Sequence, residues 1–298
     1  MATRAPRSIA GRVVAITGGA RGIGRATAQA LIDQGAKVAI GDIDAPLAQR
    51  TAQQLGPSAL GLELDVTDRA GFDAFLTAVE RRLGPLDVLV NNAGIMPVGP
   101  FVAETEATAR QIVDVNLHGV INGSKLALDR FLSRNSGHLV NVASVAGKFG
   151  FPGGAIYSAS KHAVVGLSEA IRGELRGTAI DITIVMPVVV NTELGSGLQR
   201  TRGVRKVEPG EVANAIVRAL QRGHVDVWIP RSVAPLIRTA ALVPRSVTDF
   251  VNRVIKGDRV LVGPDPVQRA AYERRTTGQT RPPATAVEAD PAQEAQKV

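Results

Sequence analysis

Near its N-terminus the chain reads Thr17-Gly18-Gly19-Ala20-Arg21-Gly22-Ile23-Gly24, directly after the apolar run Val13–Thr17. Glycines permit a tight turn and let phosphate oxygens approach the backbone, and a helix that begins there presents N–H groups and a partial positive charge. The turn predicts a dinucleotide cradle formed by Gly18, Ala20, Arg21, Gly22, Ile23 and Gly24. Its Gly-x3-Gly-x-Gly spacing departs from the common dinucleotide fingerprint, and a plain strand-to-helix turn is the alternative.

Outward from this turn, short apolar runs alternate with longer amphipathic patterns as far as Pro230. The expected strands are Val13–Thr17, Lys37–Asp42, Ala59–Leu64, Asp87–Asn91, His138–Ala143, Asp181–Pro187 and Asp226–Pro230. The expected helices are Gly22–Gln34, Ala45–Gln54, Arg69–Arg82, Thr105–Ser133, Ala155–Arg176 and Pro209–Arg222. Repeated strand–helix–strand units imply parallel strands joined by right-handed crossovers. The predicted fold class is therefore α/β, a doubly wound (Rossmann) seven-stranded parallel sheet with strand order 3-2-1-4-5-6-7.

A helical C-terminal extension is expected after the sheet. We divide the chain into a flexible N-terminus (1–8), a dinucleotide-binding and catalytic domain (9–230), a basic amphipathic extension (231–275) and a disordered tail (276–298). Apolar residues recur at three- and four-residue spacing from Val233 to Ile255, and a further short helix is expected at Pro264–Arg275. This apolar stripe could be buried against the chain's own substrate cleft, a neighbouring subunit or an anionic membrane surface. We favour docking on protein.

The composition excludes several kinds of site. The 298 residues contain no cysteine, which excludes disulfides, Cys-based zinc sites, iron–sulfur clusters and a thiol nucleophile. The four histidines show no metal-ligand spacing, so we expect no metal site. The formal net charge of +8 is interpreted as an Arg-rich solvated surface, because nucleic-acid binding needs a clustered patch. Since neither a secretory signal nor a membrane-spanning apolar run is found, we expect a cytoplasmic protein.

Asp42 ends the second predicted strand and bears on the choice of cofactor. A carboxylate at this place can accept hydrogen bonds from both hydroxyls of an adenosine ribose and would repel a 2′-phosphate, which favours NAD. Arg21 argues the other way, because an arginine in the glycine turn can pair with a 2′-phosphate. The alternative is that Asp42 is a helix N-cap or a turn residue, and Asp44 competes for the capping role. We give more weight to Asp42, so NAD is the expected cofactor and NADP the less favoured one.

Tyr157 and Lys161 lie four residues apart near the start of a predicted helix, and so share a helix face. A phenol has a pKa of about 10 and is a poor base at neutral pH. An ammonium about 4 Å away, at an effective dielectric constant of about 20, would favour the phenolate by about 4 kcal/mol, or roughly three pK units. Ser144 follows the fifth predicted strand, and its hydroxyl could hydrogen-bond a reacting oxygen. Tyr-x-x-x-Lys alone is usually a solvated helix face, but the glycine turn, Asp42 and Ser144 favour an acid/base pair.

Together these motifs resemble the short-chain dehydrogenase/reductase family, from Ile9 to about Pro230. The matching elements are the Thr-Gly-x3-Gly-Ile-Gly turn, Asn91-Asn92-Ala93-Gly94, Ser144 and Tyr157-x3-Lys161. The resemblance implies that Tyr157 is the catalytic acid/base and that Ser144 orients the reacting oxygen of the substrate. It also implies that Lys161 lowers the pKa of Tyr157 and binds the nicotinamide ribose.

The resemblance implies further contacts as well. A proton-relay water is expected at Asn116, within Val115-Asn116-Leu117-His118-Gly119. The cofactor contacts that it implies beyond the glycine turn are Asp42, Asp65, Val66, Asn92, Ala93, Gly94, Tyr157, Lys161, Pro187, Val190 and Thr192. The family usually has Pro-Gly after the sixth strand, whereas this chain has Pro187-Val188, which puts the local backbone path in question.

Two segments bear on the substrate. Ile95-Met96-Pro97-Val98 and Phe149-Gly150-Phe151-Pro152 flank the expected site and predict an apolar pocket for a hydrophobic substrate. The loop Thr192–Val207 contains four cations, which either meet an anionic part of the substrate or, as we favour, lie on a solvated loop. These cations are Arg200, Arg202, Arg205 and Lys206.

The leading functional hypothesis is an NAD(P)-dependent oxidoreductase that transfers a hydride between nicotinamide and a secondary alcohol or ketone. Its catalytic residues would be Asn116, Ser144, Tyr157 and Lys161. The alternatives are a catalytically silent dinucleotide-binding regulatory or scaffold module, and the same enzyme attached to a membrane surface through residues 231–275. By the resemblance, Thr105–Ser133 and Ala155–Arg176 match the helices through which the family pairs its subunits, which implies a homodimer or homotetramer.

Overall fold

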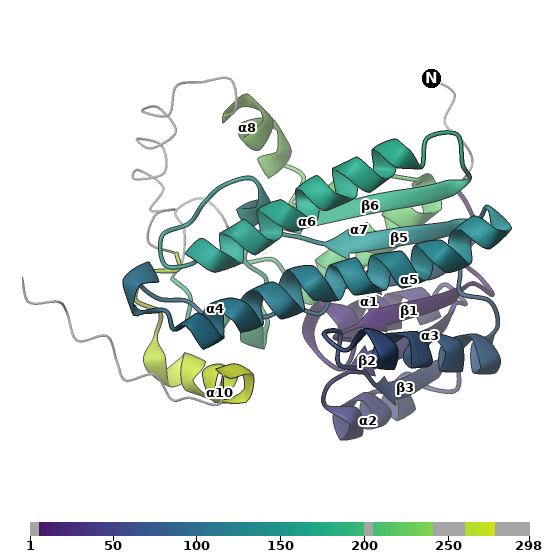
Figure 1. Cartoon of the computed structure of the whole chain (residues 1–298), viewed down its shortest axis with the longest axis horizontal. Coiled ribbons are helices and arrows are strands. Elements are labelled where there is room, and N and C mark those ends of the chain that lie inside the picture. Colours follow the sequence, from purple (N-terminus) through teal and green to yellow (C-terminus); the bar gives the residue numbers. More distant parts are fainter. Residues whose placement is uncertain (1–5, 200–204, 241–259, 278–298) are drawn as a thin grey trace, which may run out of the picture.

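The computed structural model describes residues 6–199, 205–240 and 260–277. Seven parallel strands form a sheet in the order β3-β2-β1-β4-β5-β6-β7, with helices on both faces (Figure 1). The predicted doubly wound fold and its strand order are therefore confirmed. The order reverses between β1 and β4, and such a switch point opens a crevice at the carboxyl ends of the strands.

The strands lie within one residue of their predicted bounds. They are β1 (Val13–Thr17), β2 (Lys37–Asp42), β3 (Ala59–Glu63), β4 (Val88–Asn91), β5 (Gly137–Val142), β6 (Ile180–Pro187) and β7 (Asp226–Ile229). Most of their residues are buried, as expected for strands that are covered on both faces and therefore read as continuous Val, Ile and Leu runs.

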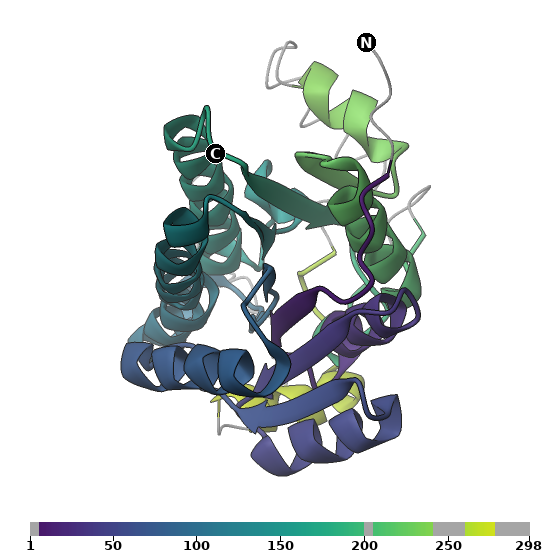
Figure 2. The ribbon, with the colours of Figure 1, turned by 90° about the vertical axis from the view of Figure 1, so that its right-hand side faces the viewer.

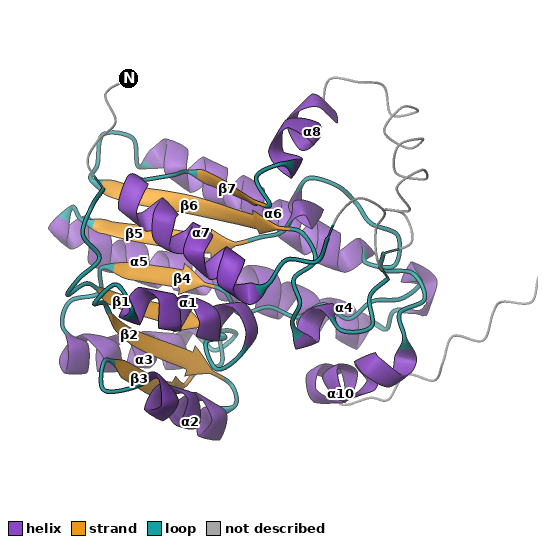
Figure 3. Cartoon of the chain, turned by 180° about the vertical axis from the view of Figure 1, so that it is seen from behind, coloured by secondary structure: helices purple, strands orange, loops and turns teal. Residues whose placement is uncertain are grey.

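Helices form a layer on each side of the sheet. One layer contains α1 (Gly22–Ile32), α2 (Ala45–Leu55) and α7 (Pro209–Arg222), seen in front of the sheet in Figure 3. The other contains α3 (Arg69–Leu83), α5 (Gly119–Arg134) and α6 (Ala155–Glu174), and Figure 2 shows the sheet between the two layers. Each layer has its own apolar core, centred on Leu31 and Ile216 on the first side and on Phe72 and Phe131 on the second.

Helix ends are determined by local sequence. The Asp44 carboxylate caps α2 by accepting the N–H of Leu47 at 3.0 Å, so Asp44 fills the N-cap role that was the alternative for Asp42. The α7 helix begins with a capping box between Glu208 and Glu211 and ends at Gly223, whose φ of 67° suits a residue without a Cβ.

The single helix expected over Thr105–Ser133 has a different internal geometry. It consists of α4 (Glu106–Val113), a π-helical turn (Asp114–His118) and α5, which follow one another without a break. π-turns inside helices are uncommon and occur frequently at functional sites. This turn contains Asn116.

The described parts of the C-terminal extension contain α8 (Val233–Ala240) and α10 (Pro266–Thr277). The α10 helix continues two residues beyond the expected boundary at residue 275. Val260 and Leu261 are buried in an apolar cluster that also contains Met96 and Leu198, so this segment packs against residues that follow β4 and β6 of the same chain. The rest of the predicted stripe (241–255), the first five residues and the tail from 278 lie outside the described residues. No helix among the described residues is long and apolar enough to cross a membrane.

Candidate active site

A cavity of about 790 Å³ lies at the carboxyl ends of the strands. Most of the predicted site residues line it. These are Gly18, Arg21, Gly22, Ile23, Asp42, Asp65, Val66, Asn92, Ala93, Gly94, Ser144, Tyr157, Lys161, Pro187, Val190 and Thr192. The remaining three, Ala20, Gly24 and Asn116, do not line the cavity and contact lining residues instead.

The glycine turn requires its glycines. Gly22 has a φ of 54°, a conformation that other residues rarely adopt. A Cβ added at Gly24 would lie 2.3 Å from the Gly18 carbonyl oxygen, so a larger residue there would displace the turn. No described side chain caps the N-terminus of α1, which leaves its first N–H groups available to phosphate oxygens.

Thr17 joins this turn to the end of β4. Its hydroxyl oxygen accepts the backbone N–H groups of Asn92 at 3.0 Å and Ala93 at 2.9 Å. In return the Asn92 side-chain amide donates to the carbonyl oxygens of Thr17 and Gly18. Two segments far apart in sequence are thereby held at one wall of the cavity. Asn92 is one of the expected cofactor contacts, whereas the role of Thr17 becomes visible only in the folded chain.

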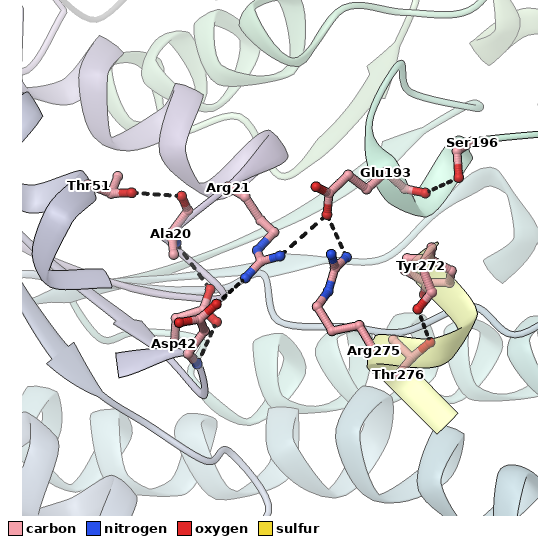
Figure 4. Close-up of polar contacts among 10 residues, drawn as sticks. Ala20, Arg21, Asp42, Thr51, Glu193, Ser196, Tyr272, Arg275 and Thr276 are labelled. Carbon is pink, nitrogen blue, oxygen red and sulfur yellow. Dashed lines mark hydrogen bonds and ion pairs between the residues drawn. The ribbon is translucent and has the colours of Figure 1, made fainter. Parts of the chain in front are cut away.

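The Asp42 carboxylate lies at the end of β2 and is 8% exposed. One of its oxygens accepts the Ala20 N–H at 3.1 Å and the other accepts the Asp44 N–H at 3.2 Å, as Figure 4 shows for Ala20. Backbone donors thus hold the carboxylate in place beside the glycine turn. Its remaining lone pairs can accept hydrogen bonds from a ligand in the cavity.

Arg21 is engaged by two carboxylates (Figure 4). Its guanidinium contacts Asp44 at 2.8 Å and Glu193, in the loop after β6, at 3.4 Å. Glu193 also contacts Arg275 of α10 at 2.5 Å. The cation that argued for NADP in the sequence is therefore paired within the protein.

The three residues of the predicted acid/base group lie together. Tyr157 on α6 lies near Ser144, which follows β5 and whose hydroxyl donates to the Pro187 carbonyl at 3.4 Å. The Ser144 hydroxyl oxygen also accepts the Ala146 N–H at 3.1 Å, which restrains its orientation. Lys161 lies one helical turn beyond Tyr157, with its Nζ atom 5.8 Å from the centre of the phenol ring and donating to the Val142 carbonyl at 3.0 Å.

The expected lowering of the Tyr157 pKa by Lys161 is not found in the protein alone. Burial raises the pKa of Tyr157 to about 12, and the polar interaction with Ser144 opposes this only in part. Burial also lowers the pKa of Lys161 to about 8, because its ammonium is likewise removed from water. The expectation of a lowered Tyr157 pKa considered only the attraction between the phenolate and the ammonium. Desolvation acts in the opposite direction and is the larger effect.

Asn116 is fully buried in the π-turn. Its side chain accepts the Ile95 N–H at 2.8 Å and donates to the Ile95 carbonyl at 2.9 Å. It also donates to Ser160, whose hydroxyl donates to the Tyr157 carbonyl. Asn116 thus ties the helix that bears Tyr157 to the strand-end segment that lines the cavity.

The loop after β6 tolerates its departure from the family pattern. Among the described residues the only non-glycine with a positive φ is Asn135, so the backbone at Val188 is accessible to any residue. Val188 packs against the apolar core on the α1 and α7 side. Of the four loop cations, Arg205 is paired with Glu211 at 2.5 Å, whereas Arg200 and Arg202 lie outside the described residues.

The helix α10 contributes residues that the sequence analysis did not place at the site. Tyr272 and Arg275 line the cavity, and Arg269 is buried beneath them. The sequence shows only that one of the chain's two tyrosines lies between arginines in a polar helix. Such a pattern does not indicate where the helix docks.

Comparisons with known proteins agree with this architecture. The family model described as short chain dehydrogenase matches residues 12–203. Galactitol 2-dehydrogenase of Agrobacterium fabrum is 35% identical over 218 residues, covering 72% of this chain and 84% of that protein. The 2-(S)-hydroxypropyl-CoM dehydrogenase 3 of Xanthobacter autotrophicus is 42% identical over 190 residues, covering 63% of this chain and 74% of that protein.

A solved structure supports the same relationship. A short chain dehydrogenase/reductase from Burkholderia phymatum in complex with NAD superposes with a TM-score of 0.72 at 27% identity. The match covers 78% of this chain and 93% of that chain. With the matched family model, the seven-stranded sheet and the glycine turn in place, the chain belongs to the short-chain dehydrogenase/reductase family of oxidoreductases.

Proposed function

We propose that the protein catalyses reversible hydride transfer between NAD and a secondary alcohol or ketone, with Tyr157 as the acid/base. The observation that carries this proposal is the buried contact between Tyr157 and Ser144, with Lys161 one helical turn away. These groups share their cavity with Asp42 and the glycine turn. A proton donor and a dinucleotide cradle in one cavity are the parts that alcohol dehydrogenation needs.

The residues present fit a nicotinamide dinucleotide. The uncapped start of α1 would hold the diphosphate, and Asp42 would accept hydrogen bonds from the adenosine ribose hydroxyls. Asn92 to Gly94, Val190 and Thr192 would line the nicotinamide half. Arg21 is paired with Asp44 and Glu193, whereas Asp42 lines the cavity and forms no ion pair with any described residue, so the charges here favour NAD over NADP.

The bound nicotinamide would accept a hydride from the carbinol carbon, or return it to a carbonyl carbon. In the reducing direction the Tyr157 O–H donates its proton to the carbonyl oxygen while the Ser144 hydroxyl orients that oxygen. In the oxidising direction the Tyr157 phenolate accepts the hydroxyl proton. With a pKa raised to about 12, the phenol of the protein alone is protonated, so oxidation depends on the charges of Lys161 and the nicotinamide to stabilise the phenolate.

The cavity favours a substrate with an apolar part. The Tyr157 ring packs in a cluster with Met96, Leu198, Val260 and Leu261, and all five residues line the cavity. Two of the relatives are named as dehydrogenases of galactitol and of 2-(S)-hydroxypropyl-CoM, which supports a secondary hydroxyl as the reacting group.

This proposal is tested with a panel of secondary alcohols of increasing chain length, assayed with NAD and with NADP by the appearance of reduced nicotinamide. We expect oxidation with NAD, and a kcat/KM that rises with the length of the alkyl chain. Ketones assayed with NADH should react in the reverse direction. Tight NADH binding without turnover of any alcohol or ketone would instead support the silent dinucleotide-binding module.

A further inference from the structure

The cavity contains a second phenol, which the proposed mechanism does not use. Tyr272 of α10 lines the cavity and is 5% exposed. Its hydroxyl oxygen accepts the backbone N–H of Met96 at 2.7 Å. Met96 packs in the same cluster as the Tyr157 ring, and a charge on Tyr272 would raise the pKa of Tyr157. The two phenols therefore line the same cavity and influence each other electrostatically.

The Tyr272 hydroxyl is a permanent donor. Burial raises the pKa of Tyr272 to about 12, although the nearby Arg269 and Arg275 cations oppose this, so the phenol is protonated at neutral pH. Its oxygen already accepts one hydrogen bond, from the Met96 N–H. Among the described residues, the hydroxyl has no other hydrogen-bond partner. The O–H proton is thus available to a ligand in the cavity.

The position of Tyr272 is fixed by Arg269. This guanidinium is 1% exposed and donates to the carbonyl oxygens of Met96, Leu194 and Ser196. It lies 4.9 Å from the centre of the Tyr272 ring. Since Leu194 and Ser196 belong to the loop after β6, one buried cation joins α10 to both walls of the substrate region. A donor held in this way loses little freedom when a ligand binds.

The surroundings of Tyr272 make this donor selective. Leu198, Val260 and Leu261 form an apolar wall in the same cavity. A purely hydrocarbon substrate would shield the Tyr272 hydroxyl from water without replacing the lost hydrogen bond. A site built around a buried polar group therefore discriminates against ligands that lack its partner.

We propose that Tyr272 is a specificity-determining residue whose hydroxyl donates a hydrogen bond to a second oxygen of the substrate. The substrate class is then a secondary alcohol or ketone that carries a further hydroxyl or carbonyl oxygen close to the reacting carbon, attached to an apolar group. This inference rests on the proposed function, because Ser144 and Tyr157 are taken to hold the reacting oxygen.

The test compares a secondary alkanol with diols of equal length, whose second hydroxyl lies on the adjacent carbon or one carbon further. Calorimetry is done on the full chain with saturating NADH, where an alcohol binds without reacting. The wild type should bind the better diol about tenfold more tightly than the alkanol, the value of about one hydrogen bond. In Tyr272→Phe the ratio of the affinity for the diol to that for the alkanol should fall to near one.

Asp265→Ala is the matched control. Asp265 caps α10 by accepting the N–H groups of Val267 and Gln268, and it does not line the cavity. This change loosens the helix without removing the donor, so the diol preference should persist. Equal binding of diols and alkanol by the wild type, a preference that survives in Tyr272→Phe, or an equal loss for all ligands in Tyr272→Phe would overturn the inference.

Turnover of the same compounds with NAD separates this inference from the proposed function. A diol preference in binding, without reduction of NAD by any alcohol, would contradict the proposed function and leave the recognition of a second oxygen standing. Turnover of alkanol and diols with equal kcat/KM would support the proposed function and contradict the inference.

Discussion

Asp42 and Arg21 have opposite charges and lie at the same glycine turn. The contacts that each makes within the protein determine which of the two charges is available to a ligand. Arg21 is held by Asp44 and Glu193, whereas Asp42 is held by the backbone N–H groups of Ala20 and Asp44. Among the described residues, the donors to Asp42 are neutral backbone groups, so none of them offsets the charge of its carboxylate. These partners are the reason why we propose a cofactor without a 2′-phosphate.

The cofactor preference should change when this charge is removed. In Asp42→Ala we expect the ratio of kcat/KM for NAD to that for NADP to fall by about tenfold or more, because a like-charge contact is lost. Steady-state kinetics with both cofactors measure this ratio. Asp33→Ala, which removes an exposed carboxylate bonded to Gln29, is the control for net charge and should keep the wild-type ratio. An unchanged ratio in Asp42→Ala would refute the role of Asp42.

If Tyr157 is the acid/base, kcat/KM should depend on pH in opposite ways for oxidation and for reduction. Its pKa, raised to about 12 by burial, keeps the phenol protonated, as reduction of a ketone requires. Oxidation of an alcohol requires the phenolate, so its kcat/KM should rise with pH above neutrality while that of reduction stays level or falls. In Lys161→Met the rise should move to higher pH, since the supporting cation is gone. Parallel pH profiles in both directions would contradict this assignment.

At the scale of elements, the sequence determines most of what is local. The strands could be predicted because each contains a short run rich in apolar residues, and the glycine turn because its residues are contiguous. The contacts of Glu193 with Arg21 and Arg275 could not be predicted, because they join segments that are far apart in the sequence and meet only in the folded chain. The docking of Tyr272 on Met96 is of the same kind. The π-turn at Asn116 could not be predicted either, because the helical periodicity through it is nearly unbroken.

A buried histidine of β5, which contacts β6, should make stability depend on pH. His138 contacts the Thr183 hydroxyl at 2.8 Å, and that hydroxyl donates to the His224 carbonyl, so we infer that His138 is neutral and donates from Nε2. Burial lowers the pKa of His138 from 6.5 to about 4, with Arg7 acting in the same direction and Asp181 opposing it. Between these values the unfolded chain binds a proton that the folded protein does not.

The free energy of unfolding should therefore fall as the pH decreases from 6.5 towards 4, by up to about 3 kcal/mol from this residue. Urea unfolding at a series of pH values measures this loss. His138→Gln keeps an N–H donor and does not titrate, so its stability should decline less over the same range. A wild type and variant whose stabilities decline in parallel would show that His138 is not the cause.

At the scale of the whole molecule, the outer face of α6 is lined by small residues. Ala159, Gly166, Ala170 and Gly173 are exposed on it, and a Cβ added at Gly166 would meet no atom within 4 Å. Small residues let a second helix approach closely. Together with the family resemblance, this face predicts a two-fold interface between subunits through α5 and α6.

Light scattering at micromolar concentration should therefore show a dimer or tetramer. Gly166→Arg fits the single chain but would obstruct a second copy, so it should shift the protein towards the monomer. Gly210→Arg is the matched control, since Gly210 is also an exposed helical glycine with open space around it, on α7 across the sheet. A monomeric wild type, or a Gly166→Arg protein with an unchanged mass, would contradict this interface.

If the reacting proton moves through Tyr157, then Tyr157→Phe should abolish most of the turnover and leave cofactor binding intact. This change removes one buried hydroxyl and preserves the ring that packs with Met96 and Leu198. With NAD and the best alcohol of the panel, kcat should fall by a factor of about 10² to 10⁴, while the affinity for NADH stays within a few-fold of the wild type. A Tyr157→Phe protein that reduces NAD at a rate within a few-fold of the wild type would contradict the account.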